Sequence, residues 1–337
     1  MARGSARPCR ACHVWACALM MKGGVARGGI MPSLFSRGAL PSASRAHLPI
    51  LRAEMTPRRA LRRVMLESLR HLSANVSGVL VGDDPECVHQ ARVALRRLRA
   101  AGQAFRPLIR GKGWRSVMAE ARRLASVLGQ LRDLDVLLLE TLPQTGLADN
   151  GNRKAASLRR ELERLRESAR AQARAALCSP AFAAWCLSLL ERMNQPSKAR
   201  DGELGRRSGF AARSLSRSWR GVGGLAERWN ELDADERHEL RKRAKKLRYS
   251  VEFFSSLYPR KQVRRYLAPL LQAQQMLGEI NDSRAASVLL RRCSENRPGL
   301  AAEAERLCRE LARQGPFDGA GMAGALQALR EAHPFWR

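Results

Sequence analysis

The sequence predicts an all-α protein built from two copies of one helical unit. From Met55 to Trp336, Ala, Leu, Arg and Glu dominate, and no stretch alternates apolar and polar residues as a half-buried strand would. Short clusters of Gly, Pro, Asp and Asn interrupt this pattern at turn-like intervals. The segments HQARVALRRLR from His89 and HELRKRAKKLRY from His238 carry the same residue types at the same spacing, 149 residues apart. We therefore expect two antiparallel helical bundles.

The repeat continues downstream of these two segments without a gap. The same offset pairs Phe105 with Phe254, Leu128-Gly129 with Leu277-Gly278, and Asp133 with Asp282. An offset kept over this length indicates an internal duplication.

Residues 1–54 differ from the rest of the chain. They are rich in Gly, Ser, Ala, Pro and Arg and lack sustained periodicity, which predicts a disordered extension or a start codon assigned too far upstream. The segment CRACH, Cys9 to His13, matches the pattern of covalent haem attachment, and Cys17 adds a third thiol near Cys12. No export signal precedes the motif, and four zinc ligands within nine residues would be cramped. A role for this cluster stays open.

Residues 55–337 are predicted to form the folded domain. The breaks leave about four helical segments on each side of a linker at 194–205, so the first bundle covers 55–195 and the second 205–337. An aspartate stands before each repeated segment, as expected of a residue that caps the first turn of a helix. These candidate caps are Asp83 or Asp84, and Asp233 or Asp235.

The charge of the chain indicates an anionic partner. Lys and Arg number 61 against 31 acids, a net charge of +30, while hydrophobic residues make up 45% of the chain. A folded protein with this self-repulsion is expected to bind a polyanion or an anionic surface. The eight cysteines show no dense pairing pattern, which favours the cytoplasm, and no apolar run is long enough to predict a membrane span.

Each repeated segment predicts a helix with a buried stripe and a cationic stripe. Apolar residues recur at steps of three and four, and the cations occupy the next position, about 100° around the helix. Like charges at these steps cost a few tenths of a kcal/mol each, and no acid is interleaved to relieve them. We therefore favour anion binding over a solvated surface. The stripes contain His89, Arg92, Arg96 and Arg99 in the first copy, and His238, Arg241, Lys245 and Arg248 in the second.

The histidines and the paired aspartates complete the candidate site. His89 and His238 stand in the first turn of equivalent helices, where each could donate a hydrogen bond to a phosphate. A structural histidine is the alternative for either. Asp133 and Asp282 could orient cations of the repeated helices, or could serve as a helix cap or a simple salt bridge. Neither histidine has the Cys, Asp or Glu neighbours of a metal site, so no metal is expected.

VHQARVALRRLR with LGQLRDLDVLL, followed by HELRKRAKKLRYSVEFF, resembles the CHAD domain, the conserved histidine α-helical domain. The resemblance covers Met55 to the C-terminus. It implies two pseudo-symmetric four-helix bundles around a basic central cavity that binds inorganic polyphosphate. The second copy departs from the first, since Asn281 replaces Arg132 and Arg284 replaces Asp135. Carried over to this chain, the binding residues would be His89, Arg92, Arg96, Arg97, Arg99, Arg132, His238, Arg241, Lys245, Lys246, Arg248 and Tyr249.

The sequence leaves three functional classes for this basic helical chain: a polyphosphate binder, a nucleic-acid binder and an enzyme that acts on phosphate compounds. Closely spaced phosphates suit clustered Arg forks and Lys point charges, which favours reversible binding of polyphosphate, including polyphosphate granules, in the cytoplasm. A nucleic-acid binder explains the net charge equally well, but aromatics make up only 5% of the chain and offer few stacking platforms. An enzyme would need an activated nucleophile, a carboxylate cluster for Mg²⁺ or a Gly-rich phosphate loop, and none was found. We therefore expect a non-catalytic binder without a cofactor.

Overall fold

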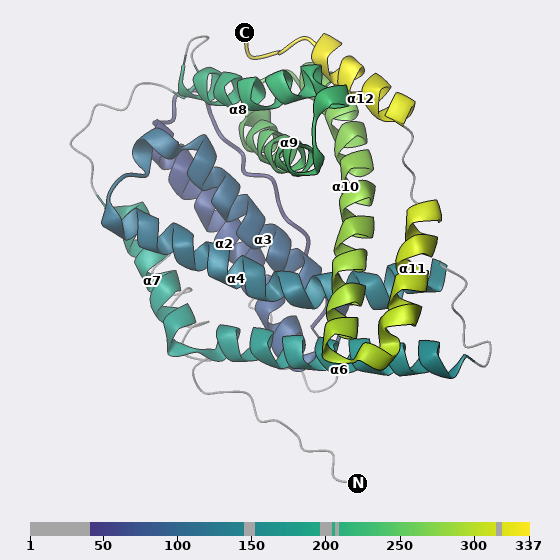
Figure 1. Cartoon of the computed structure of the whole chain (residues 1–337). Coiled ribbons are helices and arrows are strands. Elements are labelled where there is room, and N and C mark those ends of the chain that lie inside the picture. The colour runs from purple at the N-terminus through teal and green to yellow at the C-terminus, as the bar shows by residue number, and fades with distance from the viewer. Residues whose placement is uncertain (1–40, 145–151, 196–203, 206–208, 315–318) are drawn as a thin grey trace.

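The computed structural model describes residues 41–144, 152–195, 204–205, 209–314 and 319–337. These residues form helices and connecting segments without any strand, so the predicted all-α fold is confirmed for them (Figure 1). The first half contains α2 (Pro57–Val81), α3 (Pro85–Ala104), η1 (Arg106–Leu108), α4 (Lys112–Val136), η2 (Leu137–Thr141), α5 (Leu142–Gln144), α6 (Arg153–Cys178) and α7 (Pro180–Asn194). The second half contains α8 (Phe210–Glu227), η3 (Trp229–Glu231), α9 (Ala234–Phe254), η4 (Ser255–Leu257), α10 (Arg260–Asn296), η5 (Pro298–Leu300), α11 (Ala301–Gln314) and α12 (Gly319–Glu331).

The two repeated segments form equivalent helices, α3 and α9. Asp84 caps α3 by accepting the backbone N–H of Glu86 at 2.8 Å, and Pro85 occupies the first turn, where its missing N–H costs nothing. Asp233 caps α9 in a reciprocal capping box with Glu236. The predicted caps therefore explain why α9 begins where the 149-residue offset places the start of α3.

The predicted apolar stripes are buried. Of the six members in α3 and just beyond it, the five that carry a side chain are at most 4% exposed and Gly102 is partly buried, and the five in α9 are at most 1% exposed. The two helices pack on each other, and the rings of Phe105 and Phe254 meet with centroids 5.4 Å apart. These two phenylalanines are paired by the offset, so equivalent ends of the two copies contact each other at the centre of the molecule. The predicted stripe residues are Val88, Ala91, Leu95, Leu98, Gly102 and Phe105, and Leu240, Ala244, Leu247, Val251 and Phe254.

The helices around this centre follow the same order in both halves. In the first, α3 packs on α2 and α4, and α4 packs on α6. In the second, α9 packs on α8 and α10, and α10 packs on α11 and α12. The last two helices of each half also match, since α7 packs on α4 and α2 as α12 packs on α10 and α8, although α6 is longer than α11 (Figure 1).

Residues 41–54 make ordered contacts with both halves, which differs from the disordered extension expected over 1–54. Asn75 of α2 accepts the N–H of Ser44 at 2.9 Å, and Ser256 accepts the N–H of Leu51 at 2.8 Å. The side chain of Leu51 is buried, and Ala53 accepts a backbone hydrogen bond from Gly205. Residues 1–40, including the CRACH segment, lie outside the described residues.

We expect truncation to separate these two parts of the N-terminal segment. A chain starting at Met55 loses the buried Leu51 side chain and several hydrogen bonds, which should lower the free energy of unfolding by at least about 2 kcal/mol. For a chain of this size, the melting temperature should then fall by at least about 3 °C. A chain starting at Pro41 keeps these contacts and is the matched control. Equal melting temperatures for the two truncated chains, measured by circular dichroism, would show that the segment contributes nothing.

No single helix in the described ranges is long and apolar enough to cross a membrane. One bent pair, α6 and α7, meets the length and composition requirement when the two are taken together across a 52° break.

Candidate functional site

Four cations from the two repeated helices form what we call the central cation cluster. Burial, followed by repulsion from Arg241 and Arg96, lowers the pKa of Lys245 to about 7. Burial also lowers the pKa of the Arg96 guanidinium, with further repulsion from Arg92. Arg96 and Lys245 occupy equivalent repeat positions, so the cluster is built around one residue from each copy. The cluster comprises Arg92 and Arg96 of α3, and Arg241 and Lys245 of α9.

Each half also supplies one aspartate to this cluster. Arg92 donates from Nη1 to Asp133 Oδ1 at 2.7 Å, and its Nη1 also lies 3.2 Å from the carbonyl oxygen of Gly129. Arg241 Nη2 lies 3.7 Å from Asp282 Oδ1, an ion pair without a close hydrogen bond. Each aspartate therefore pairs with an arginine of its own half, closely in the first copy and loosely in the second. Asp133 and Asp282 also line one small hollow beside η2.

The cluster holds more positive charge and more donors than its own residues satisfy. Four cations face two carboxylates. The Nε atoms of Arg96 and Arg241 are buried, and neither has a hydrogen-bond acceptor among the described residues. A buried donor without an acceptor costs about 1–3 kcal/mol, and more when the group is charged. A ligand with several anionic oxygens would satisfy both the charge and these donors.

The two histidines lie near the N-terminal ends of α3 and α9, and their surroundings differ. His89 is half-buried, and burial, followed by repulsion from Arg132, lowers its pKa. His238 is exposed, and its Nδ1 lies 3.1 Å from Asn281 Oδ1. Arg132 and Asn281 occupy equivalent positions, so this single substitution makes one end of the site more cationic. Arg132 is held in place by Glu140, which accepts its Nη2 at 2.7 Å.

Arg99 and Lys246 extend the positive charge beyond the central cation cluster. The pKa of Arg99 is lowered by burial and then by repulsion from Arg122 of α4. The pKa of Lys246 is lowered mainly by burial, and repulsion from Lys242 and Arg99 lowers it further. Attraction to Glu239 acts in the opposite direction and raises this pKa. The two site residues therefore lie near each other at the side of the cluster. The sequence analysis did not predict Arg122 as a neighbour of the site, because it lies on an exposed face of α4 that carries no repeated motif.

Arg97 and Tyr249 are placed in the interface between α3 and α9. Arg97 is 5% exposed and donates from Nη1 to Glu252 Oε2 at 2.6 Å. Its guanidinium lies 5.2 Å from the ring centroid of Phe253, and Tyr249 is 3% exposed. Arg248 stacks over Tyr249 at 4.9 Å and lies within ion-pair distance of the same Glu252. These contacts join the two helices, and neither Arg97 nor Tyr249 is open to a ligand in the cluster.

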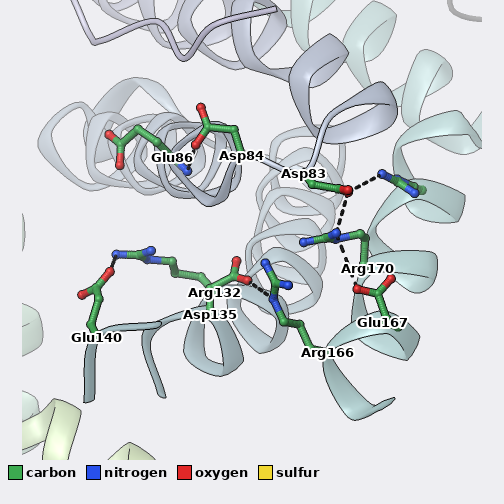
Figure 2. A network of polar contacts seen from close by, with 10 residues as sticks. Asp83, Asp84, Glu86, Arg132, Asp135, Glu140, Arg166, Glu167 and Arg170 are labelled. Atoms are coloured by element: carbon green, nitrogen blue, oxygen red, sulfur yellow. Dashed lines mark hydrogen bonds and ion pairs between the residues drawn. The ribbon is translucent and has the colours of Figure 1, made fainter. Parts of the chain in front are cut away.

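A separate polar network fixes the helices that carry the site (Figure 2). Asp135 is fully buried and accepts Arg166 Nε of α6 at 2.6 Å, so it faces away from Asp133. Asp83, just before α3, accepts Nη1 of Arg170 at 2.5 Å. α6 therefore holds both the end of α4 and the start of α3, where His89 lies. Arg284, the equivalent of Asp135, instead lies 3.4 Å from Asp235.

Among the described residues, no group of three or more His, Cys, Asp or Glu side chains is arranged to hold a metal ion. The cluster of Cys9, Cys12, His13 and Cys17 falls outside those residues.

Comparisons with known proteins agree with this architecture. The family model described as the CHAD domain matches residues 63–291. The crystal structure of the CHAD domain from the plant Ricinus communis superposes with a TM-score of 0.77 at 29% identity, covering 86% of this chain and 98% of that chain. PptA from Streptomyces chartreusis superposes with a TM-score of 0.59 at 19% identity, covering 82% of this chain and 97% of its own, which shows a shared fold. No curated protein matches the chain.

Proposed function

Because the chain belongs to the CHAD domain family, we propose that it binds inorganic polyphosphate reversibly, in a cavity between two pseudo-symmetric four-helix bundles. The observation that carries this proposal is the central cation cluster, with its excess charge and its buried guanidinium donors that lack acceptors. Polyphosphate supplies what the cluster lacks, since each phosphate unit offers anionic oxygens to Arg and Lys.

The contacts between equivalent residues support the pseudo-symmetric arrangement. The rings of Phe105 and Phe254 are in contact, tilted by 51° to each other. Arg96 lies close enough to Lys245 for its charge to lower the pKa of that lysine, and Asp133 and Asp282 line one hollow. A two-fold axis that passes close to all three pairs would bring equivalent residues together in this way. A linear ligand on that axis would touch both repeated helices at once.

The surroundings of the cluster favour polyphosphate over nucleic acid. Sequence-tolerant binding of single strands uses aromatic rings as stacking platforms. Tyr249 and Phe253 are the rings nearest the site cations in the described contacts, and both are buried between α3 and α9. A chain of phosphates needs no such platform.

Binding without chemistry is the simplest activity for this site. Asp133 already pairs with Arg92, and Asp282 lies beside Arg241, so both carboxylates serve to hold cations. The sequence offers no Gly-rich phosphate loop with its lysine. The proposal therefore includes a cytoplasmic, non-catalytic role with polyphosphate, free or in granules, as the partner.

We expect long-chain polyphosphate to bind more tightly than duplex DNA of equal total charge. Both should be measured at one fixed salt concentration, because salt weakens both interactions. The polymer recovered after incubation should keep its length. Preferential binding of DNA would support the nucleic-acid alternative, whereas orthophosphate release abolished by a substitution in the cluster would identify an enzyme.

A further inference from the structure

A second group of arginines lies where α8 meets the end of α3, outside the central cation cluster. Three of them stand at steps of four and three residues along α8, so they share one face of that helix. Ser214 of α8 donates its hydroxyl to the carbonyl of Ala104 at 2.7 Å, which fixes α8 beside η1. All four arginines are exposed. We call them the α8 arginine patch: Arg106, Arg213, Arg217 and Arg220.

The patch concentrates positive charge on one face of α8 and on the adjoining η1. Burial, followed by repulsion from Arg106, Arg220 and Arg213, lowers the pKa of Arg217. Over the ranges that the structure describes, no carboxylate forms an ion pair with Arg106, Arg217 or Arg220. Some exposed arginines on other helices of this protein do have such partners, as Arg159 has in Glu163 at 3.1 Å. Unrelieved like charges destabilise a helix, so their presence calls for an anionic partner.

The patch belongs to one copy of the repeat only. The 149-residue offset places Val64, Ser68 and His71 of α2 at the positions of Arg213, Arg217 and Arg220, and all three are buried. The patch is therefore not part of the duplicated arrangement that forms the central cation cluster.

A line of cations connects the patch with the central cluster. Arg99 and Lys246 lie beside the cluster, and Arg243 is among the cations that repel Lys246. Arg243 in turn donates from Nη1 to the carbonyl of Gly221 at 3.1 Å, next to Arg220 of the patch. Glu239 bonds Arg243 and so offsets part of this charge. A flexible polyanion leaving the cluster on this side would meet cations continuously.

We propose that the α8 arginine patch is an accessory site that binds the part of a long polyphosphate chain extending out of the central cluster. This inference rests on the proposed function. The three α8 residues span about 10 Å along the helix, given its rise of 1.5 Å per residue. A chain long enough to reach both sites gains affinity because the second contact is intramolecular, whereas a short chain cannot. The patch thus makes affinity depend on chain length.

The test compares the triple variant R106Q/R217Q/R220Q with the wild type, using tripolyphosphate and long-chain polyphosphate as ligands. We expect the variant to bind the long chain about tenfold more weakly, because three exposed charge contacts are lost. Its affinity for tripolyphosphate should change less than about twofold. The slope of log K against log salt for the long chain should fall by about 2, at about 0.7 per lost contact.

The control variant R153Q/R160Q/R309Q removes the same charge from exposed positions on α6 and α11. Figure 1 shows α6 at the bottom of the molecule and α8 at the top. If the control variant lost as much affinity for the long chain as the patch variant, the loss would reflect net charge alone and the proposal would be overturned. An unchanged affinity of the patch variant for the long chain would also overturn it. A loss of duplex DNA binding without a loss of polyphosphate binding would assign the patch to nucleic acid instead. Failure of the wild type to bind either phosphate would refute the proposed function itself.

Discussion

Replacing both Arg96 and Lys245 by Gln should lower the affinity for polyphosphate by more than a hundredfold. The charge of Arg96 on α3 lowers the pKa of Lys245 on α9, and the two helices pack on each other. Each charge-assisted hydrogen bond to the ligand is worth about 1.5–3 kcal/mol. The single variants should therefore each lose about ten- to a hundredfold. Because one ligand couples the two positions, the double variant should lose less than the product of the single effects. Isothermal titration calorimetry at fixed salt measures all four proteins.

The same substitutions should leave the fold intact. Each removes a cation from a repulsive cluster and introduces a good helix former, so the melting temperature should stay constant or rise. Arg97→Gln is the internal contrast, because it leaves Glu252 without its buried partner and should lower the melting temperature. It should change the affinity of the folded protein far less than Arg96→Gln does, although the two arginines are adjacent in sequence. A normal affinity in the folded Arg96 and Lys245 double variant would refute a shared site.

The features that depend on short sequence segments were predictable. Asp84 and Asp233 define the helix starts through hydrogen bonds to backbone groups only a few residues away. The buried stripes follow from the period of the α-helix, and the pairing of Arg92 with Asp133 follows from two elements that recur together. Local caps, periodicity and the duplication therefore suffice for the helices and for most of the cluster.

The features that depend on how helices cross were not predictable. Arg97 and Lys246 hold equivalent repeat positions, yet Arg97 is buried against Glu252 while Lys246 is exposed. The burial of the two residues differs because α3 and α9 do not pack symmetrically around these positions. The spacing of residues along a single helix cannot reveal how that helix packs on another. The order of residues 41–54 was also hidden, since this segment is held by side chains such as Asn75 and Ser256 from distant helices.

Lys245 introduces a titratable group where the first copy has an arginine. Its free pKa is about 7, lowered first by burial and then by Arg241, Arg96 and Arg92, while Asp282 opposes the shift. A bound phosphate would attract the ammonium and raise this pKa, so the complex would hold more protons than the free protein above pH 7. Below pH 7 the residue is charged in both states and contributes no pH dependence. Affinity should therefore fall as the pH rises from 7 towards the pKa of the complex, by at most about tenfold per pH unit.

Lys245→Arg should remove this loss of affinity, because an arginine stays charged throughout the range. The ratio of wild-type to variant affinity, measured from pH 6 to pH 9 at fixed ionic strength, cancels the titration of the ligand's own end groups. It should be constant below pH 7 and decrease above it. His89 titrates in a different window, since its pKa lies below the ordinary value of 6.5, and Lys246→Arg controls for the other lysine with a lowered pKa. Proton uptake on binding at pH 8, obtained calorimetrically from buffers of different ionisation enthalpy, should disappear in Lys245→Arg. A ratio that stays flat to pH 9 would mean that Lys245 remains charged in the free protein, and that the cluster binds anions without a linked proton.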